Sequence, residues 1–350
     1  MMQDRVKLLV KDCVKVNNVF YCIAKQFNLI FSLDVNTGKV EILSIIPDNA
    51  YEGEEFCGCI TFYKGELYIG TIMSNTIWIF NIKAKKWDKI KKKEIPNIST
   101  GSLLQAFVYN EHVYMIGGSY PAIIIIDPKT KQIEYIEKPF KDKNDNDITD
   151  VFFRAQHVLI DDTIYIPCCF DNTVLKMNLC TTEYEWIRVG ESFNRYSGIT
   201  FADGFFWLAP RQNSNVVRWD GRQNICEFRL SERYDVSVCY GGCCRSGDEI
   251  YFWNIVNGET FSVDINENTR KENKHKYVLI KEFDNLTVFQ KMDGFFEIYI
   301  KDCLDISFDL NINFNVINKK YIDNDLSLKY KNKIYAEGEP FSLGAFLKMI

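Results

Sequence analysis

Three arginines in the middle of the sequence have the chemistry to bind an anion. Arg154, Arg195 and Arg211 each stand in a stretch that also carries aromatic or amide side chains. The planar guanidinium group donates paired hydrogen bonds to carboxylates and phosphates. If the three arginines come together, they form a cationic site for a polar or anionic small molecule or peptide. The side chains expected to complete its walls are Tyr196, Tyr240, Trp253 and Asn213.

A second interpretation makes the same arginines structural. A guanidinium group taken out of water must be paired or hydrogen-bonded. Carboxylates in nearby stretches, such as Asp171, Glu191 and Asp235, are suitable partners. If each arginine is neutralised in this way, or if the three lie far apart, there is no anion site.

The candidate catalytic residues are chosen by their positions in the chain, because no catalytic motif identifies them. Tyr196 or Tyr240 could act as an acid or base, because the neighbouring cation of Arg195 lowers the pKa of a phenol. Cys57 or Cys59 could act as a nucleophile if a cation favours the thiolate. The sequence contains no GxSxG, HExxH, P-loop or GxGxxG motif. Its three histidines are scattered and no pair of CxxC arms is present, so we predict no metal site and no cofactor.

A repeat along the chain indicates how these residues are positioned. At six places an aromatic residue is followed 13 residues later by Asp or Asn, and successive places lie 42 to 51 residues apart. Short apolar runs and turn residues alternate around each pair, as expected of strands. A period near 45 residues with several short strands is typical of a β-propeller. The pairs are Tyr21/Asp34, Tyr68/Asn81, Tyr114/Asp127, Tyr165/Asn178, Trp207/Asp220 and Tyr251/Asp264, and we assign Phe296/Asp309 as a seventh.

The positions of turn residues support the same repeating group of strands. A pair such as Lys64-Gly65 or Asp203-Gly204 stands before each aromatic strand, where hairpin turns need positive φ. The Asp or Asn that ends the next strand can accept hydrogen bonds from the following turn. We therefore interpret these acidic and amide residues as structural.

The third repeat resembles Kelch-type β-propellers. It combines Tyr114, the double glycine Gly117-Gly118 and the turn Asp127-Pro128-Lys129-Thr130, whereas the other repeats lack a double glycine directly after the aromatic strand. The resemblance implies a propeller fold and carries over no catalytic residue. We predict an all-β, seven-bladed propeller of four-stranded antiparallel blades over residues 13–322. Residues 1–12 should supply a strand that closes the last blade, and residues 323–350 an extension that packs on the ring, with a short helix over 342–350.

In such a ring, the tight turns lie on one face and the longer loops on the other. Loops on a rigid scaffold are where binding residues concentrate. The spacing places Arg154, Arg195 and Arg211 in these longer loops, on the adjacent fourth and fifth blades. The basic run from Lys83 to Lys93 is instead expected to be a solvated edge strand, since lysines discourage pairing between sheets.

Charge and composition argue against several classes of binding partner and location. The net charge of −5, with both signs mixed along the chain, argues against nucleic acid and anionic membranes. No run of about 20 apolar residues is present, so no membrane span is expected. The first residues lack the layout of a signal peptide, and 12 cysteines then favour a reducing, cytoplasmic location. Abundant Lys, Asn and Ile indicate an AT-rich bacterial genome.

Two kinds of function remain open. The first is a non-catalytic protein that binds a polar or anionic molecule, a peptide or a protein partner at the mouth of the central channel. The second is a propeller enzyme, such as a lyase, epimerase or hydrolase, with an Arg/Tyr site in the same mouth. A wet pocket in which Tyr or Cys reaches another titratable group would favour the enzyme. A channel occupied by side chains would favour the binding platform.

Overall fold

The computed structural model describes the greater part of the chain. For the strands after residue 266, it describes the backbone alone. The described residues are 5–7, 10–24, 28–34, 40–47, 56–95, 101–141, 153, 156–211, 214–230, 240–246, 248–254, 260–266, 270–273, 277–283, 286–291, 296–300 and 311–313.

Six sheets each contain four antiparallel strands that follow one another along the chain. They are sheet one, β2 (Val10–Val16), β3 (Val19–Ala24), β4 (Leu29–Asp34) and β5 (Val40–Ile45); sheet two, β6 (Cys57–Tyr63), β7 (Glu66–Thr71), β8 (Thr76–Asn81) and β9 (Lys86–Lys91); sheet three, β10 (Leu103–Tyr109), β11 (His112–Gly117), β12 (Ile123–Ile126) and β13 (Ile133–Ile136); sheet four, β14 (Val158–Ile160), β15 (Thr163–Pro167), β16 (Thr173–Asn178) and β17 (Tyr184–Arg188); sheet five, β18 (Tyr196–Ala202), β19 (Phe205–Pro210), β20 (Val216–Trp219) and β21 (Asn224–Phe228); and sheet six, β22 (Tyr240–Ser246), β23 (Glu249–Asn254), β24 (Thr260–Asp264) and β25 (Arg270–Asn273). A 3-10 turn, η1 (Lys138–Phe140), follows sheet three.

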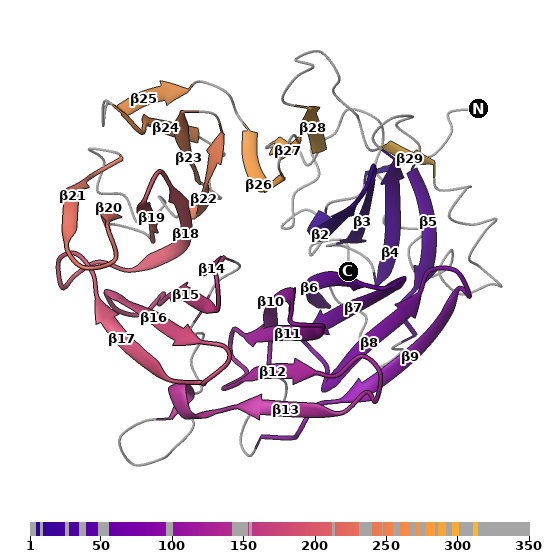
Figure 1. The fold of residues 1–350 in the computed structure, drawn as a ribbon. Helices are drawn as coiled ribbons and strands as arrows, with labels where there is room; N and C mark the ends of the chain where they lie inside the picture. Colours follow the sequence, from indigo (N-terminus) through magenta and orange to yellow (C-terminus); the bar gives the residue numbers. More distant parts are fainter. Residues whose placement is uncertain are drawn as a thin grey trace.

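The sheets are arranged around a centre, with the first strand of each sheet innermost and the last outermost (Figure 1). A further sheet, sheet seven, has three described strands, β26 (Tyr277–Phe283), β27 (Leu286–Lys291) and β28 (Phe296–Ile300). Its first strand contacts both β22 and β2. The fold is therefore the predicted all-β propeller. Seven complete four-stranded blades remain a prediction, and the proposed helix over 342–350 lies outside the described residues.

The N-terminal strand pairs with chain from the other end. β1 (Arg5–Lys7) runs antiparallel to β29 (Asn311–Asn313), with Val6 opposite Ile312. The prediction was that the first residues complete the sheet of the last blade. The pair forms a separate two-stranded sheet, however, and is not hydrogen-bonded to β26–β28. The boundaries at residues 12 and 322 stay predictions.

The seventh sequence pair was assigned to the wrong strand. β26 and β27 close at the pair Phe283–Leu286, so the second strand of sheet seven begins at Leu286. Phe296 opens β28, the third strand, opposite Gln290. The assignment of Phe296 as a second-strand aromatic is therefore wrong. The 13-residue spacing from Phe296 to Asp309 therefore does not start from a second strand in this sheet.

Apolar side chains fill the space between successive sheets. Ile69 and Trp78 of sheet two pack with Ile23 and Ile30 of sheet one, and equivalent clusters join sheets two to three, three to four, four to five, and five to six. The middle strands are thus covered on both faces, which explains continuous apolar runs such as Ile123–Ile126.

The tight turns have the predicted geometry. Lys64 and Gly65 have φ of 44° and 91°, and Asp203 and Gly204 have φ of 50° and 84°. Both pairs connect the first and second strands of a sheet. Two consecutive residues with positive φ match the twist of a two-residue hairpin, which is why Gly, Asn and Asp recur there.

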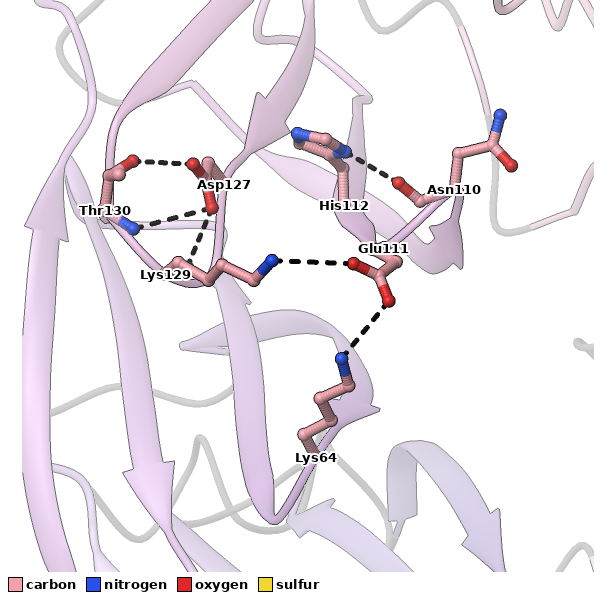
Figure 2. A network of polar contacts seen from close by, with 7 residues as sticks. All are labelled: Lys64, Asn110, Glu111, His112, Asp127, Lys129 and Thr130. Carbon is pink, nitrogen blue, oxygen red and sulfur yellow. Dashed lines mark hydrogen bonds and ion pairs between the residues drawn. The ribbon is translucent and has the colours of Figure 1, made fainter.

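The Asp residues that end the third strands have the expected structural role. The Asp127 carboxylate accepts hydrogen bonds from the Lys129 amide at 2.8 Å and the Thr130 hydroxyl at 2.9 Å (Figure 2). On the same face, Glu111 lies 3.3 Å from the Lys64 amine and 3.7 Å from that of Lys129. These ion pairs are exposed, so they add little stability.

The loop after β11 folds back against Ser102, and this close approach explains the double glycine Gly117-Gly118. Gly118 donates its amide to the Ser102 carbonyl at 2.8 Å, and the hydroxyls of Ser102 and Ser119 lie 2.9 Å apart. A Cβ on Gly117 would lie 1.7 Å from the Tyr120 carbonyl oxygen, and one on Gly118 would lie 2.3 Å from Leu104. Both positions are therefore too crowded for a side chain.

Gly117→Ala should destabilise the protein by about 3 kcal/mol or more, because the added methyl group meets backbone that cannot rotate away. Gly65→Ala is the matched control. Gly65 has φ of 91° but open space around it, so its replacement should cost only about 1 to 2 kcal/mol of backbone strain. Urea unfolding measures both. Equal losses for the two variants would contradict the steric explanation.

Candidate functional site

Arg195 and Arg211 meet at the loop face of sheet five. Arg195 directly precedes β18 and Arg211 directly follows β19, so both lie at the end of this hairpin away from its Asp203-Gly204 turn. The Arg211 amide donates a hydrogen bond to the Arg195 carbonyl at 2.7 Å. The two predicted residues are thus brought together by the pairing of β18 with β19.

Backbone carbonyls hold the guanidinium groups of both arginines. Nη1 of Arg195 donates to the carbonyls of Ser192 at 3.1 Å and Asn194 at 2.6 Å, and Nη1 of Arg211 donates to the carbonyl of Cys169 at 2.8 Å. Among the described residues, neither guanidinium lies within 4.0 Å of a carboxylate. Asp171 is engaged with the amide and hydroxyl of Thr173 instead. Asp235 lies outside the described residues.

Two exposed phenylalanines stand beside these arginines. Phe170 is 41% exposed, and its ring centre lies 5.9 Å from the guanidinium carbon of Arg211. Phe193 is 50% exposed and stands between the two residues whose carbonyls hold Arg195. We call Arg195, Arg211, Phe170 and Phe193 the mouth patch. It combines positive charge with apolar surface on the loops of sheets four and five.

Tyr196 is buried beneath this patch. Its hydroxyl donates to the Val189 carbonyl, and its side chain has no exposed surface. Burial raises the pKa of Tyr196 and outweighs the opposing effect of Arg195. The expectation that the neighbouring cation lowers this pKa is therefore wrong, because removal of the phenolate from water dominates.

The other predicted residues lie elsewhere or are only partly described. Cys57 and Cys59 are buried on β6 of sheet two, away from the patch on sheets four and five. Tyr240 and Trp253 lie on β22 and β23 of sheet six, and only the backbone of these two residues is described. Arg154 and Asn213 lie outside the described residues, so their place in the site stays a prediction.

Six of the seven innermost strands contain a β-bulge, and β14 of sheet four shows none in its described residues. Such bulges redirect side chains and often occur near functional sites. The register shifts lie between Val10 and Asp12, Cys57 and Cys59, Leu103 and Gln105, Tyr196 and Gly198, Tyr240 and Gly242, and Leu279 and Lys281.

Polar side chains near the innermost strands form hydrogen bonds from one sheet to another. The Gln156 amide group donates to the Cys243 carbonyl at 2.8 Å and accepts from the Cys243 amide at 3.0 Å. It passes Gly198, where a Cβ would lie 1.9 Å from the Gln156 oxygen. His157 and Gln105 join sheets four and three in a similar way, with Nδ1 and Oε1 2.5 Å apart. These hydrogen bonds link neighbouring sheets at their inner edges.

Lys92 is a buried amine that sequence reasoning placed in a solvated basic run. It is 3% exposed, and Nζ donates to the Gly101 carbonyl at 2.6 Å, with the Tyr120 ring centre 5.1 Å away. Burial lowers the pKa of Lys92 to about 7, and nearby Cys59 opposes this only in part. The sequence gives no signal for this burial, because Lys91 and Lys93 on either side are the same residue type and yet are exposed.

Comparison with known proteins identifies the fold. No family model and no curated protein matches the sequence. Among solved structures, a catalytically inactive virginiamycin B lyase from Staphylococcus aureus, determined with quinupristin, is similar (12% identity, TM-score 0.63, 83% of this chain and 92% of that one). The fold is that of a β-propeller. A streptogramin B lyase (13%, 0.57, 88% and 92%) and the extracellular domain of a hybrid two-component system from B. thetaiotaomicron (9%, 0.55, 89% and 40%) are also similar.

These identities show the fold alone, and none of these proteins is named a Kelch protein. Within the described part of the chain, no helix is long and apolar enough to cross a membrane. The same residues include no group of three His, Cys, Asp or Glu side chains that could hold a metal ion.

Lys92→Met should change how stability depends on pH. In the folded protein the amine is largely neutral above its pKa of about 7, whereas in the unfolded chain it stays protonated up to about pH 10.4. The wild-type free energy of unfolding should therefore rise between these values by up to about 1.4 kcal/mol per pH unit from this group. Below pH 7 both states bind the proton, and this contribution is constant.

Urea unfolding of both proteins at pH 7 and pH 9 measures the effect. Relative to Lys92→Met, the wild type should gain about 2 to 3 kcal/mol over this interval. Lys86→Met, which alters an exposed lysine of β9, should keep the wild-type dependence. Parallel pH profiles for the wild type and Lys92→Met would contradict a buried neutral amine.

Proposed function

We propose that this chain is a non-catalytic binding protein whose mouth patch recognises a polar or anionic ligand, such as a small carboxylate or the carboxylate of a peptide. The observation that carries this proposal is the way the two guanidinium groups are held. A carbonyl oxygen fixes a guanidinium by hydrogen bonding but does not neutralise its charge. Positive charge is therefore positioned without being compensated by a described carboxylate, and an arriving anion gains charge-assisted hydrogen bonds.

The geometry leaves donors available. A guanidinium has five N–H groups, and the described bonds of Arg195 and Arg211 use Nη1 alone. Phe170 and Phe193 add exposed aromatic surface next to this charge. Exposed apolar surface rimmed by polar groups is common at binding sites. The ligand that fits best combines a carboxylate with an aromatic or apolar part.

The alternative is an enzyme, such as a lyase, epimerase or hydrolase, with its site in the same mouth. It draws support from the similar fold of the two lyases, which is an analogy of fold and not of site. Tyr196, Cys57 and Cys59, three of the proposed catalytic groups, are buried. The Kelch-like third repeat fits a platform role. These observations favour binding over catalysis.

Benzoate and benzamide form a matched pair of probes, since they differ mainly in charge. Ligand-observed NMR should detect saturable benzoate binding to the wild type and little binding of benzamide. Arg211→Gln should weaken benzoate binding about tenfold, as expected when one charge-assisted pair is lost. Arg222→Gln, at an exposed turn on the opposite face, is the control and should bind like the wild type.

Two results would overturn the proposal. One is the absence of saturable benzoate binding to the folded wild-type protein. The other is benzoate binding that Arg211→Gln leaves unchanged, which would place the anion elsewhere. Circular dichroism of each variant confirms that the sheets are intact.

A further inference from the structure

Two cysteines face each other across the first hairpin of sheet one. Cys13 on β2 is the direct partner of Cys22 on β3. The hairpin closes at the pair Val16–Val19, around the two-residue turn Asn17-Asn18. In a two-residue hairpin, the closing pair is hydrogen-bonded, and hydrogen-bonded and non-hydrogen-bonded pairs then alternate. Counting three pairs back from the turn makes Cys13–Cys22 a non-hydrogen-bonded pair.

This register suits a disulfide. Directly opposed residues of a non-hydrogen-bonded pair have Cα atoms about 4.5 Å apart, with their side chains on one face of the sheet. Disulfides span Cα separations of roughly 4.4 to 6.8 Å. Both side chains are buried, at 1% and 3% exposure.

The pair lies where the two ends of the chain approach each other. Val14 and Tyr21 pack into the core between sheets one and two. Because side chains alternate along a strand, Cys13 and Cys22 lie on the other face of sheet one. β2 contacts β26 of sheet seven. In addition, β1, which precedes β2 in the chain, pairs with β29, which follows sheet seven in the chain. A covalent link here would fix the hairpin whose first strand contacts sheet seven.

The other described cysteines lack this arrangement. Cys168 and Cys169, like Cys243 and Cys244, are adjacent in sequence. Across their sheets, Cys57 faces Thr71, Cys59 faces Gly70, Cys226 faces Arg218, Cys243 faces Phe252 and Cys244 faces Tyr251. Among the cysteines that the structure describes, Cys13 and Cys22 are the one pair in direct cross-strand register.

We propose that Cys13 and Cys22 form a reversible disulfide that locks the first hairpin of sheet one. The oxidant is a low-molecular-weight disulfide. One cysteine thiolate attacks it and releases one thiol, and the second cysteine thiolate then attacks the mixed disulfide and releases the other. The protein loses two protons and two electrons, and the reagent is reduced to two thiols. Because both thiols are buried, exchange requires local opening of sheet one.

Treatment of the full-length folded protein with oxidised glutathione tests this proposal. After alkylation of free thiols and digestion without reductant, mass spectrometry should find one peptide linked through Cys13 and Cys22, lost on treatment with dithiothreitol. Cys22→Ser should abolish the linked peptide, and Cys226→Ser should leave it unchanged. The oxidised form should resist proteolysis between residues 10 and 24 more than the reduced form.

A second measurement covers slow exchange in the folded state. The chain is refolded from urea in the presence of oxidised glutathione, and circular dichroism verifies its native sheet content. The Cys13–Cys22 link should again predominate. If both cysteines remain alkylated as thiols in the native and the refolded protein while exposed Cys180 has reacted, the proposal is overturned. A link from Cys13 to another cysteine would overturn it as well.

Discussion

Apolar packing between successive sheets is the constraint on which the rest of this structure depends. Trp207 and Val216 of sheet five share a core with Ile250 and Phe252 of sheet six, and the other consecutive sheets up to sheet six are joined in the same way. Each sheet is thereby fixed relative to the next. Loops at the strand ends inherit this rigidity, so the position of Arg211 follows from the packing of the strands around it.

The centre of the ring and its rim have different roles. The Gln156 side chain forms hydrogen bonds with the backbone N–H and C=O groups of Cys243, and Gly198 has no side chain that would occupy the same space. The central edge is therefore used for holding sheets four to six together. At the rim, by contrast, Arg195 and Arg211 carry charge that described carboxylates do not neutralise. The proposed binding site thus lies on the loop face, whereas the hydrogen bonds of Gln156 lie at the inner strands.

Local chemistry explains what could be predicted from the sequence. Turn pairs such as Lys64-Gly65 and the caps formed by Asp127 depend on residues close together in the chain, so their pattern is visible directly. The adjacency of Arg195 and Arg211 also follows from one hairpin. The burial of Tyr196 and Lys92 depends on neighbouring sheets and loops, which spacing does not reveal. Phe296 was misplaced because the 13-residue spacing alone does not distinguish the second strand of a sheet from the third.

The crystal structure of the protein grown with benzoate tests the central claim most directly, because it examines the sheet packing and the mouth patch together. The account predicts successive antiparallel sheets packed about one axis, with the benzoate carboxylate hydrogen-bonded to Arg211 or Arg195 and its ring against Phe170 or Phe193. Benzoate bound only elsewhere, or both guanidinium groups paired with protein carboxylates, would contradict it.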